Sequence, residues 1–327
     1  MRVLVTGGAG YVGSHAVACL RRAGHEVLVY DNLGLGHKSA VPAEGLVVGD
    51  LAEQSRLASL LREGRIDAVM HFAALALVGE SMSDPALYYR NNVVGSLSLL
   101  EAMRAAGVAR IVFSSTCATY GEPEKMPISE DAPQRPVNPY GATKLMIERA
   151  LADFSAAYGI GYAALRYFNA CGAAPDGSLG EDHATETHLI PLTLQVALGQ
   201  RERISIFGAD YPTPDGTCIR DYVHVDDLAD AHLRALERLR PGVGLCLNLG
   251  TGRGFSVREV IGACRRVTGH EIPEEVGPRR PGDPPELVAD PARAMAALGW
   301  RPRYRELEAI AETAWRWHRS HPRGFGD

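Results

Sequence analysis

The sequence contains few cysteines, and those it has are scattered. The six are Cys19, Cys117, Cys171, Cys218, Cys246 and Cys264, and none belongs to a C-x-x-C pair. This spacing argues against a cysteine zinc site and against a disulfide framework, and it indicates a reducing compartment. We therefore expect a cytoplasmic protein with no metal site.

Long apolar runs and blocks of like charge are also missing. No run reaches the roughly 18 apolar residues that span a bilayer, and residues 1–7 lack the features of a signal peptide. The net charge of −5 gives no general attraction to nucleic acid or to an acidic membrane. We expect neither as a partner, so any anionic ligand must be held by local groups.

The composition that remains is ordinary for a globular protein. Of the 327 residues, 46% are hydrophobic and 22% are charged, which is enough apolar material for a sizeable core. This length predicts roughly two domains, or one large α/β unit that carries a second lobe.

A glycine-rich turn near the N-terminus lies between a strand and a helix. The short apolar run Val3–Val5 leads into Gly7, Gly10 and Gly13, then into a helix, and then into a second strand that ends at Asp31. Such glycines let backbone N–H groups approach a pyrophosphate at the helix N-terminus. Asp31 follows Gly13 by 18 residues, close to the spacing of the acid that binds the adenosine ribose. A carboxylate there accepts a 2′-hydroxyl and repels a 2′-phosphate, which favours NAD over NADP; a plain tight turn is the alternative.

Further strands and helices complete an α/β pattern. Strands are expected at 46–48, 67–70, 111–113, 163–167, 220–225 and 245–249, and helices at 54–63, 88–103 and 228–239, with Asp226 and Asp227 as the caps of the last helix. Residues 171–217 differ in character, since they are rich in Gly, Pro, Asp and His. The pattern predicts a doubly wound parallel-sheet Rossmann domain of residues 1–170 and about 218–250. A smaller α/β lobe of about 171–217 and 251–327 completes the chain.

Tyr140 and Lys144 are four residues apart on an expected helix that Asn138 and Pro139 begin. This spacing places a phenol and an ammonium on one face. A nearby positive charge favours the phenolate and lowers the pKa of a Tyr from its ordinary value of about 10. The pair is therefore a candidate general base with its tuning cation, although a solvated helix with one half-buried Tyr is the plainer alternative.

The ordered motifs resemble those of the UDP-glucose 4-epimerases, the galactose epimerases of the extended short-chain dehydrogenase/reductase superfamily. The similarity runs along the whole chain and rests on Gly7-x-x-Gly10-x-x-Gly13, His71-Phe-Ala-Ala74, Ser114-Ser-Thr116, Tyr140-x-x-x-Lys144, Arg166-Tyr-Phe-Asn169, Thr187-His-Leu-Ile-Pro191, Asp215-Gly-Thr-Cys-Ile-Arg-Asp-Tyr222 and Arg280-Pro-Gly-Asp283. The last four are the more specific, because they are typical of nucleotide-sugar enzymes.

The resemblance implies a set of site residues. The NAD-binding residues would be Gly7, Gly10, Tyr11, Val12, Gly13, Asp31, Asn32, Asp50, Leu51, Phe72, Ala73, Ala74, Asn92, Ser114, Tyr140, Lys144 and Tyr167. The residues that bind the UDP-sugar would be Thr116, Tyr140, Asn169, His188, Leu189, Ser205, Phe207, Arg220, Tyr222, Arg280, Asp283 and Leu287. Tyr140, Lys144 and Thr116 would be catalytic.

The implied reaction is reversible epimerisation at C4 of a UDP-hexose. Hydride passes to tightly bound NAD, the 4-keto sugar rotates, and the same hydride returns to its other face. Ala76 stands where many relatives carry a Lys that contacts the cofactor, so the sequence does not decide how strongly NAD is retained. Leu287 stands at the gate for substrate size, which leaves a UDP-N-acetylglucosamine 4-epimerase or a dual-specificity enzyme as alternatives.

Other chemistries and states are less well supported. A nucleotide-sugar 4,6-dehydratase needs an acid and a base directly after the Ser/Thr, where this chain has Cys117 and Ala118. A non-catalytic NAD-binding protein would commonly lack the Tyr–Lys pair. The plain alternative for Arg220 and Asp221 is an ion pair with each other. The resemblance also implies a homodimer through the helices at about 88–105 and 140–157.

Overall fold

The computed structural model describes residues 1–280 and 282–327. Its central feature is a seven-stranded sheet in the order β10-β6-β5-β4-β1-β2-β3, and every neighbouring pair in it is parallel. The strands are β1 (Arg2–Thr6), β2 (Glu26–Asp31), β3 (Leu46–Val48), β4 (Ala68–His71), β5 (Arg110–Thr116), β6 (Gly161–Tyr167) and β10 (Gly244–Leu249).

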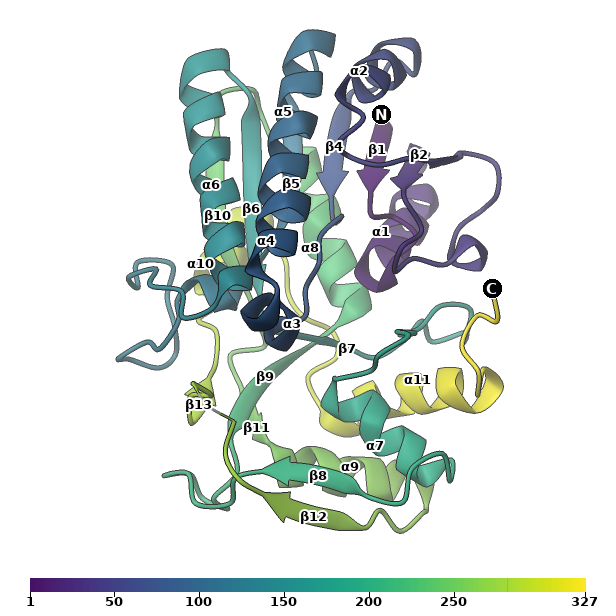
Figure 1. The fold of residues 1–327 in the computed structure, drawn as a ribbon, viewed down its shortest axis with the longest axis vertical. Helices are drawn as coiled ribbons and strands as arrows, with labels where there is room; N and C mark the ends of the chain where they lie inside the picture. Colours follow the sequence, from purple (N-terminus) through teal and green to yellow (C-terminus); the bar gives the residue numbers. More distant parts are fainter. Residues whose placement is uncertain (281) are drawn as a thin grey trace.

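Helices cover both faces of this sheet (Figure 1). One layer contains α1 (Tyr11–Arg22), α8 (Val225–Arg238) and α10 (Ala292–Leu298); the other contains α2 (Gln54–Glu63), α5 (Gly95–Ala106) and α6 (Pro139–Tyr158). Strand β1 shows why the sheet needs a helix layer on each face. Its Val3 and Val5 pack into the first layer, and its Leu4 packs into the second. Strands that are buried on both faces have continuous apolar sequences. The predicted doubly wound parallel sheet is confirmed.

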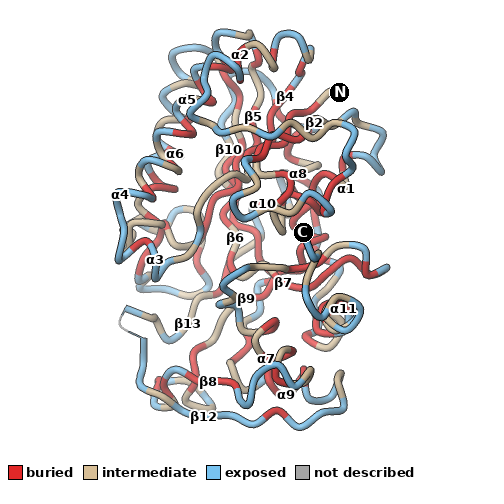
Figure 2. Tube along the Cα trace, turned by 45° about the vertical axis from the view of Figure 1, so that its right-hand side comes forward, coloured by how far each residue is buried: buried red, intermediate tan, exposed pale blue. Residues whose placement is uncertain are grey.

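A smaller lobe lies beyond the carboxyl ends of the central strands (Figure 1). It contains β7 (Asn169–Cys171), β8 (Ile204–Phe207), β9 (Ile219–His224), β11 (Gly254–Ser256), β12 (Glu274–Gly277) and β13 (Glu286–Leu287), with helices α7 (Leu189–Ala197), α9 (Val257–Thr268) and α11 (Leu307–Ser320). The strands form a β11-β9-β13 sheet with β7 on β9, and a separate β8–β12 pair. Figure 2 shows buried residues in the central strands and exposed residues along β12.

The helix expected at 88–103 is present but is not uniform. Helices α3 (Val78–Ser83) and α4 (Pro85–Tyr88) precede a π-helical segment, η2 (Tyr89–Val94), which continues into α5. Such π-helical segments are frequent at functional sites, and this one carries Asn91 and Asn92. The remaining short helices are η1 (Lys38–Ala40) and η3 (Cys117–Thr119). Among the residues described, no helix combines the length and the apolar character needed to cross a membrane.

The capping role expected of Asp226 and Asp227 is wrong. Helix α8 begins earlier, at Val225, and its N-cap is His224, whose Nδ1 accepts from the backbone N–H of Asp226. The Asp227 carboxylate instead accepts the backbone N–H groups of Arg303 and Tyr304, at 2.9 Å each. It therefore joins α8 to a segment far along the chain.

The two-domain division stays a prediction, and the structure differs from its boundaries in two places. Strand β9 pairs with β7, β11 and β13 and not with the central sheet. Helix α10 lies in the predicted sugar-binding lobe by sequence but packs its Leu298 into the first core layer of the central sheet.

Candidate active site

The glycine loop and the ends of four central strands line one cleft. It has about 260 Å³ of space for a ligand. Nine of the predicted cofactor residues line it, namely Gly7, Gly10, Asp31, Asn32, Asp50, Leu51, Phe72, Ala73 and Ala74. Because these residues follow β1, β2, β3 and β4, the cleft lies at the carboxyl edge of the sheet, where open α/β folds bind ligands.

Two glycines are needed for the shape of this cleft. Gly7 has φ +68, and a Cβ there would lie 2.4 Å from the backbone nitrogen of Ala73. A Cβ on Gly13 would lie 2.0 Å from the carbonyl oxygen of Gly7. Any side chain at either position would therefore push the loop away from the first turn of α1 or from the end of β4.

Asp31 is buried beneath the loop that it helps to shape. Its Oδ2 accepts from the backbone N–H of Ala9 at 2.9 Å, and its Oδ1 accepts from that of Leu33 at 2.9 Å. Beside it, Asn32 donates to the carboxylate of Asp50 at 3.0 Å. A carboxylate that lines the cleft next to a glycine cradle fits the adenosine ribose and pyrophosphate of NAD.

Other predicted cofactor residues support the cleft from outside its lining. The hydroxyl of Tyr11, at the start of α1, donates to the carbonyl of Gly172 at 2.6 Å, and Val12 follows in the same helical turn. The amide of Asn92 exchanges hydrogen bonds with the backbone of Leu75 at 2.9 and 3.0 Å. It also donates to the Thr143 hydroxyl at 3.2 Å. Asn92 thus holds the loop after β4 against α6.

Sequence reasoning missed several lining residues. Besides the predicted set, the cleft is lined by Tyr30, Gly34, Leu35, Gly36, Gly49, Leu75 and Asn91. The segment Gly34–Gly36 is separated from Asn32 only by Leu33, so the available signal was a pair of glycines shortly after the strand that ends at Asp31.

Helix α6 places Tyr140 and Lys144 against the end of β5. Lys144 is buried, and its Nζ donates to the carbonyl of Ser114 at 2.9 Å. The same ammonium lies 5.9 Å from the centre of the Tyr140 ring. The Ser114 hydroxyl shares a 2.8 Å hydrogen bond with the hydroxyl of Tyr167. Four predicted site residues from α6, β5 and β6 therefore meet at one place.

The protonation of this pair differs from the sequence expectation. Burial raises the pKa of the Tyr140 phenol above 10.0; the neighbouring Tyr167 adds to this shift and a hydrogen bond with Thr116 opposes it. Burial also lowers the pKa of Lys144 to about 7, against the opposing influence of Glu148. The expectation that the nearby Lys144 lowers the pKa of Tyr140 from its ordinary value is therefore wrong, because desolvation acts on both groups.

Thr116 ends β5 beside the Tyr140 phenol. Its Oγ1 accepts from the backbone N–H of Ala118 at 3.1 Å, and its carbonyl accepts from the Thr119 hydroxyl at 3.0 Å. Burial raises the pKa of the adjacent Cys117 thiol to about 12. Cys117 is therefore a neutral thiol and offers no base.

A buried polar network lies directly behind Lys144, and sequence reasoning missed it. Glu148, one helical turn further along α6, forms an ion pair with Arg166 at 2.6 Å and accepts from the Ser115 hydroxyl at 2.5 Å. Arg166 in turn donates to the Tyr120 hydroxyl at 2.8 Å. The signal in the sequence was the i, i+4 spacing of Lys144 and Glu148 on one helix face.

Predicted substrate residues come together on the smaller lobe. Arg220 on β9 forms an ion pair with Asp283, and Leu287 on β13 is its neighbour across the strand pair. The Arg280 guanidinium lies 4.0 Å from the centre of the Phe207 ring. Asn169 on β7 is the strand partner of Tyr222. Guanidinium groups suit a diphosphate because they offer paired donors.

The alternative of an ion pair between Arg220 and Asp221 is wrong. Successive residues of β9 point to opposite faces, so Asp221 is buried on the other side of the strand. There its carboxylate accepts from the backbone N–H groups of Thr251, Gly252 and Ala289 at 2.9, 3.2 and 3.2 Å.

Three further predicted substrate residues, His188, Leu189 and Ser205, lie at the start of α7 and on β8. His188 is the N-cap of α7, which Leu189 begins, and its imidazole lies 2.7 Å from the carboxylate of Glu181. Ser205 is exposed on β8, on the same side of the strand as Phe207. The binding roles of all these residues stay predictions.

Comparisons with known proteins agree with this arrangement. The profile of the NAD dependent epimerase/dehydratase family matches residues 3–250. The UDP-glucose 4-epimerase of Halalkalibacterium halodurans is 54% identical over 326 residues, which is 99% of this chain and 98% of that protein.

Solved structures are similar along the whole length. The UDP-glucose 4-epimerase of Brucella ovis in complex with NAD superposes with a TM-score of 0.93 at 51% identity, covering 96% of this chain and 97% of that one. The Bifidobacterium longum enzyme in complex with NAD+ and UDP gives a TM-score of 0.94 at 38% identity, covering 99% and 100%. The resemblance to the UDP-glucose 4-epimerases is confirmed, and this chain belongs to the NAD dependent epimerase/dehydratase family.

Proposed function

We propose that this protein catalyses the reversible epimerisation at C4 of a UDP-hexose, interconverting UDP-glucose and UDP-galactose with NAD as a bound cofactor. The observation that carries the proposal is the meeting of Tyr140, Lys144 and Ser114 at the carboxyl edge of the sheet, next to the glycine-lined cleft. The full-length similarity to UDP-glucose 4-epimerases supports the same reaction.

The residues that would hold NAD are those of the cleft and its supports. The N-terminus of α1, which begins at Tyr11 directly after the glycine loop, would hold the pyrophosphate, and Asp31 would accept from the adenosine ribose. When bound, NAD supplies an acceptor for hydride from the sugar carbon, a positive charge in its oxidised form, and a donor for the return of the hydride. Because the cycle is redox-neutral and returns NAD to its oxidised form, we expect the cofactor to stay bound between turnovers.

The chain's own residues handle the proton. Tyr140 takes the proton of the sugar 4-hydroxyl as the alcohol is oxidised and gives it back when the alcohol is restored. Its burial keeps the free phenol neutral, so a positive charge nearby is needed to stabilise the phenolate. Thr116, which bonds the phenol, positions the reacting oxygen. Lys144, held by Ser114, supplies a cation on the same helix face.

The substrate must be held at one end and free to turn at the other. Arg220, Arg280 and Phe207 on the smaller lobe would hold the uridine diphosphate, and the ion pair with Asp283 orients Arg220. The hexose would then lie between this group and Tyr140. Rotation of the 4-keto sugar presents its second face without release of the nucleotide.

The size of the Leu287 side chain supports a second class of substrate. It is half-buried on β13 next to Arg220, and its side chain is smaller than the Tyr that excludes N-acetylated sugars by resemblance. A UDP-N-acetylglucosamine 4-epimerase activity is therefore the second candidate. A 4,6-dehydratase is disfavoured, because Cys117 and Ala118 offer no acid or base.

The proposal includes a homodimer through α5 and α6. These helices are neighbours on one outer face of the sheet (Figure 1). They and the adjoining η2 carry four exposed large apolar side chains, namely Val94, Leu97, Met146 and Tyr158. Exposed apolar side chains gathered on one face are typical of an interface. The six free cysteines support the cytoplasm as the location.

The experiment that tests the function uses the purified protein with UDP-galactose and no added cofactor. We expect UDP-glucose to form until equilibrium, with no net release of NADH. Formation of a 4-keto-6-deoxy sugar would contradict the proposal and support the dehydratase. Product analysis with both UDP-N-acetylhexosamines in parallel decides the substrate class.

A further inference from the structure

Four side chains in the connection between β7 and α7 form a cluster, and among them only His188 is a predicted substrate residue. Glu181, His183, Glu186 and His188 each present one ligand atom, and these atoms all lie within 4.8 Å of one another. The Nδ1 of His183 lies 3.4 Å from Glu181 and 3.3 Å from Glu186. The Nδ1 of His188 lies 2.7 Å from Glu181 and 3.1 Å from Glu186.

Glu181 provides a second and independent observation. Its residue is 4% exposed, yet its Oε1 has no hydrogen-bond partner among the described residues. Both imidazole nitrogens lie close to this oxygen, but neither is aligned to donate to it. A buried carboxylate oxygen without a partner is costly. The Nδ1 atoms of both imidazoles form hydrogen bonds with the Glu186 carboxylate instead, at 3.3 and 3.1 Å, which leaves the Oε1 of Glu181 without an aligned donor.

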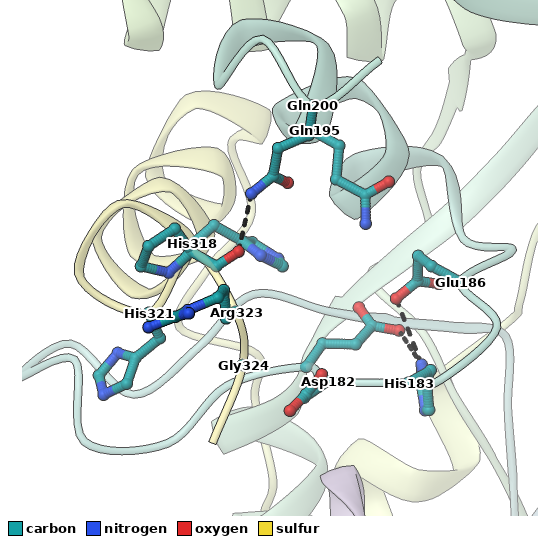
Figure 3. Close-up of a pocket in the computed structure, with 11 residues that line it drawn as sticks. Asp182, His183, Glu186, Gln195, Gln200, His318, His321, Arg323 and Gly324 are labelled. Atoms are coloured by element: carbon teal, nitrogen blue, oxygen red, sulfur yellow. Dashed lines mark hydrogen bonds and ion pairs between the residues drawn. The ribbon is translucent and has the colours of Figure 1, made fainter. Parts of the chain in front are cut away.

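The backbone around the cluster is already held in place. The carbonyl of Glu181 accepts from the indole N–H of Trp317 at 3.2 Å. The Glu186 carboxylate accepts from the backbone N–H groups of Thr187 and His188 at 2.7 and 2.8 Å. In Figure 3 the Glu186 carboxylate points toward the His183 imidazole beside a cavity that His318 and Arg323 also line.

We propose that Glu181, His183, Glu186 and His188 bind one Zn²⁺ ion. Bonds of about 2.1 Å to a tetrahedral zinc place its ligand atoms roughly 3.4 Å apart. The two distances from the Nδ1 of His183 are close to this value, and the two from the Nδ1 of His188 are shorter. Two neutral imidazoles and two carboxylates leave no excess charge on the ion. Calcium and magnesium prefer oxygen ligands, so two nitrogen donors favour a transition metal. Scattered cysteines led us to expect no metal site, whereas this one uses histidine and glutamate.

The position of the cluster indicates a structural role. The connection that carries it leads directly into α7, where Leu189 is a predicted substrate residue. On its other side, the His183 ring lies 6.4 Å from the ring of Tyr11 at the glycine loop. A zinc ion here would hold the segment between the cofactor cleft and the smaller lobe in one conformation.

The test uses the full chain, stripped with a chelator and then titrated with ZnCl₂. We expect saturable binding of one zinc per chain by calorimetry and by elemental analysis after dialysis, together with a Tm higher by several degrees. Titration with Co²⁺ should give the visible absorption of a tetrahedral N/O site. This last measurement needs no variant, so it stands even if a substitution impairs folding.

Variants assign the ligands. His183→Ala and Glu181→Gln should each bind zinc more than about 100-fold more weakly. His318→Gln removes another imidazole beside the same cavity, and it should bind zinc as the parent does. Absence of saturable binding by the folded parent, or unchanged affinity in His183→Ala and Glu181→Gln, would overturn the proposal. Loss of zinc in His318→Gln with retention in His183→Ala would overturn it too.

Discussion

The ammonium of Lys144 donates to the backbone carbonyl of Ser114 at 2.9 Å and so ties α6 to the end of β5. This contact explains why a helix residue and a strand end belong to one site. It also orients α6 so that Tyr140, one turn before Lys144, lies beside Thr116 at the sheet edge.

Tyr140→Phe should lower turnover of UDP-galactose by at least about 100-fold, because general base catalysis typically contributes that much. Bound NAD should be retained, since the ring remains. Tyr158→Phe is a matched control on the same helix, where the side chain is half exposed, and it should leave turnover unchanged. Equal turnover in Tyr140→Phe and the parent would exclude Tyr140 as the base.

Lys144→Met should change how stability depends on pH in the cofactor-free protein. The pKa of Lys144 is about 7 in the folded chain against 10.5 ordinarily. Between these values the unfolded chain binds more protons, so this group makes stability rise with pH. From pH 7 to pH 9 the parent should gain up to about 2 kcal/mol relative to the variant. Urea unfolding at both pH values measures the difference; identical slopes would show that Lys144 is not desolvated.

Breaking the buried pair of Glu148 and Arg166 should destabilise the fold strongly. Glu148→Leu leaves the Arg166 charge buried without its partner, and such changes cost about 3–5 kcal/mol. The double variant Glu148→Leu, Arg166→Met removes both charges and should recover a large part of the loss. A double-mutant cycle by chemical denaturation measures the coupling, and additive single effects would contradict a coupled pair.

Leu287 should control the choice between sugars. Leu287→Tyr should lower kcat/KM for UDP-N-acetylglucosamine relative to UDP-galactose, because a larger ring leaves less room for the acetamide. Leu287→Ala should shift the ratio in the opposite direction. Steady-state kinetics with both substrates test this. If both variants leave the ratio of the two kcat/KM values unchanged, Leu287 does not control substrate size.

Ala76→Lys should strengthen the retention of NAD. Ala76 is exposed in the loop after β4, and a cation there can reach a pyrophosphate in the adjoining cleft. We expect the fraction of protein that keeps NAD after extensive dialysis to rise. Ala76→Gln, which adds length without charge, is the control. Equal retention in the two variants would mean that charge at this position does not contribute.

Much of the cofactor cleft could be predicted because its signals are local. The strand, the glycines, the helix and Asp31 lie within one short unit of chain. The steric limit at Gly13 follows from that unit closing on itself, whereas the limit at Gly7 comes from Ala73 after β4. The pairing of Tyr140 with Lys144 needed only the periodicity of a helix.

Other features required residues far apart in the chain. The Glu148–Arg166–Tyr120 network joins α6, β6 and the residue after η3, and no single periodicity contains it. Asp226 and Asp227 were misread as caps because a helix start looks alike in sequence whether its acids serve the helix or a distant segment. Their partners, His15 and Arg303, lie far from them in sequence.

Residue order and spacing were therefore sufficient for the fold class, the cofactor loop and the candidate base, since each depends on a repeat within one element or one strand–helix unit. The protonation states of the site residues, and the set of groups that meet at the site, depend on tertiary packing. The pKa values of Tyr140 and Lys144 moved away from the sequence expectation because desolvation depends on everything that surrounds a group. The same is true of the histidine and glutamate cluster, whose unpartnered oxygen exists only once α11 and the connection to α7 have packed together.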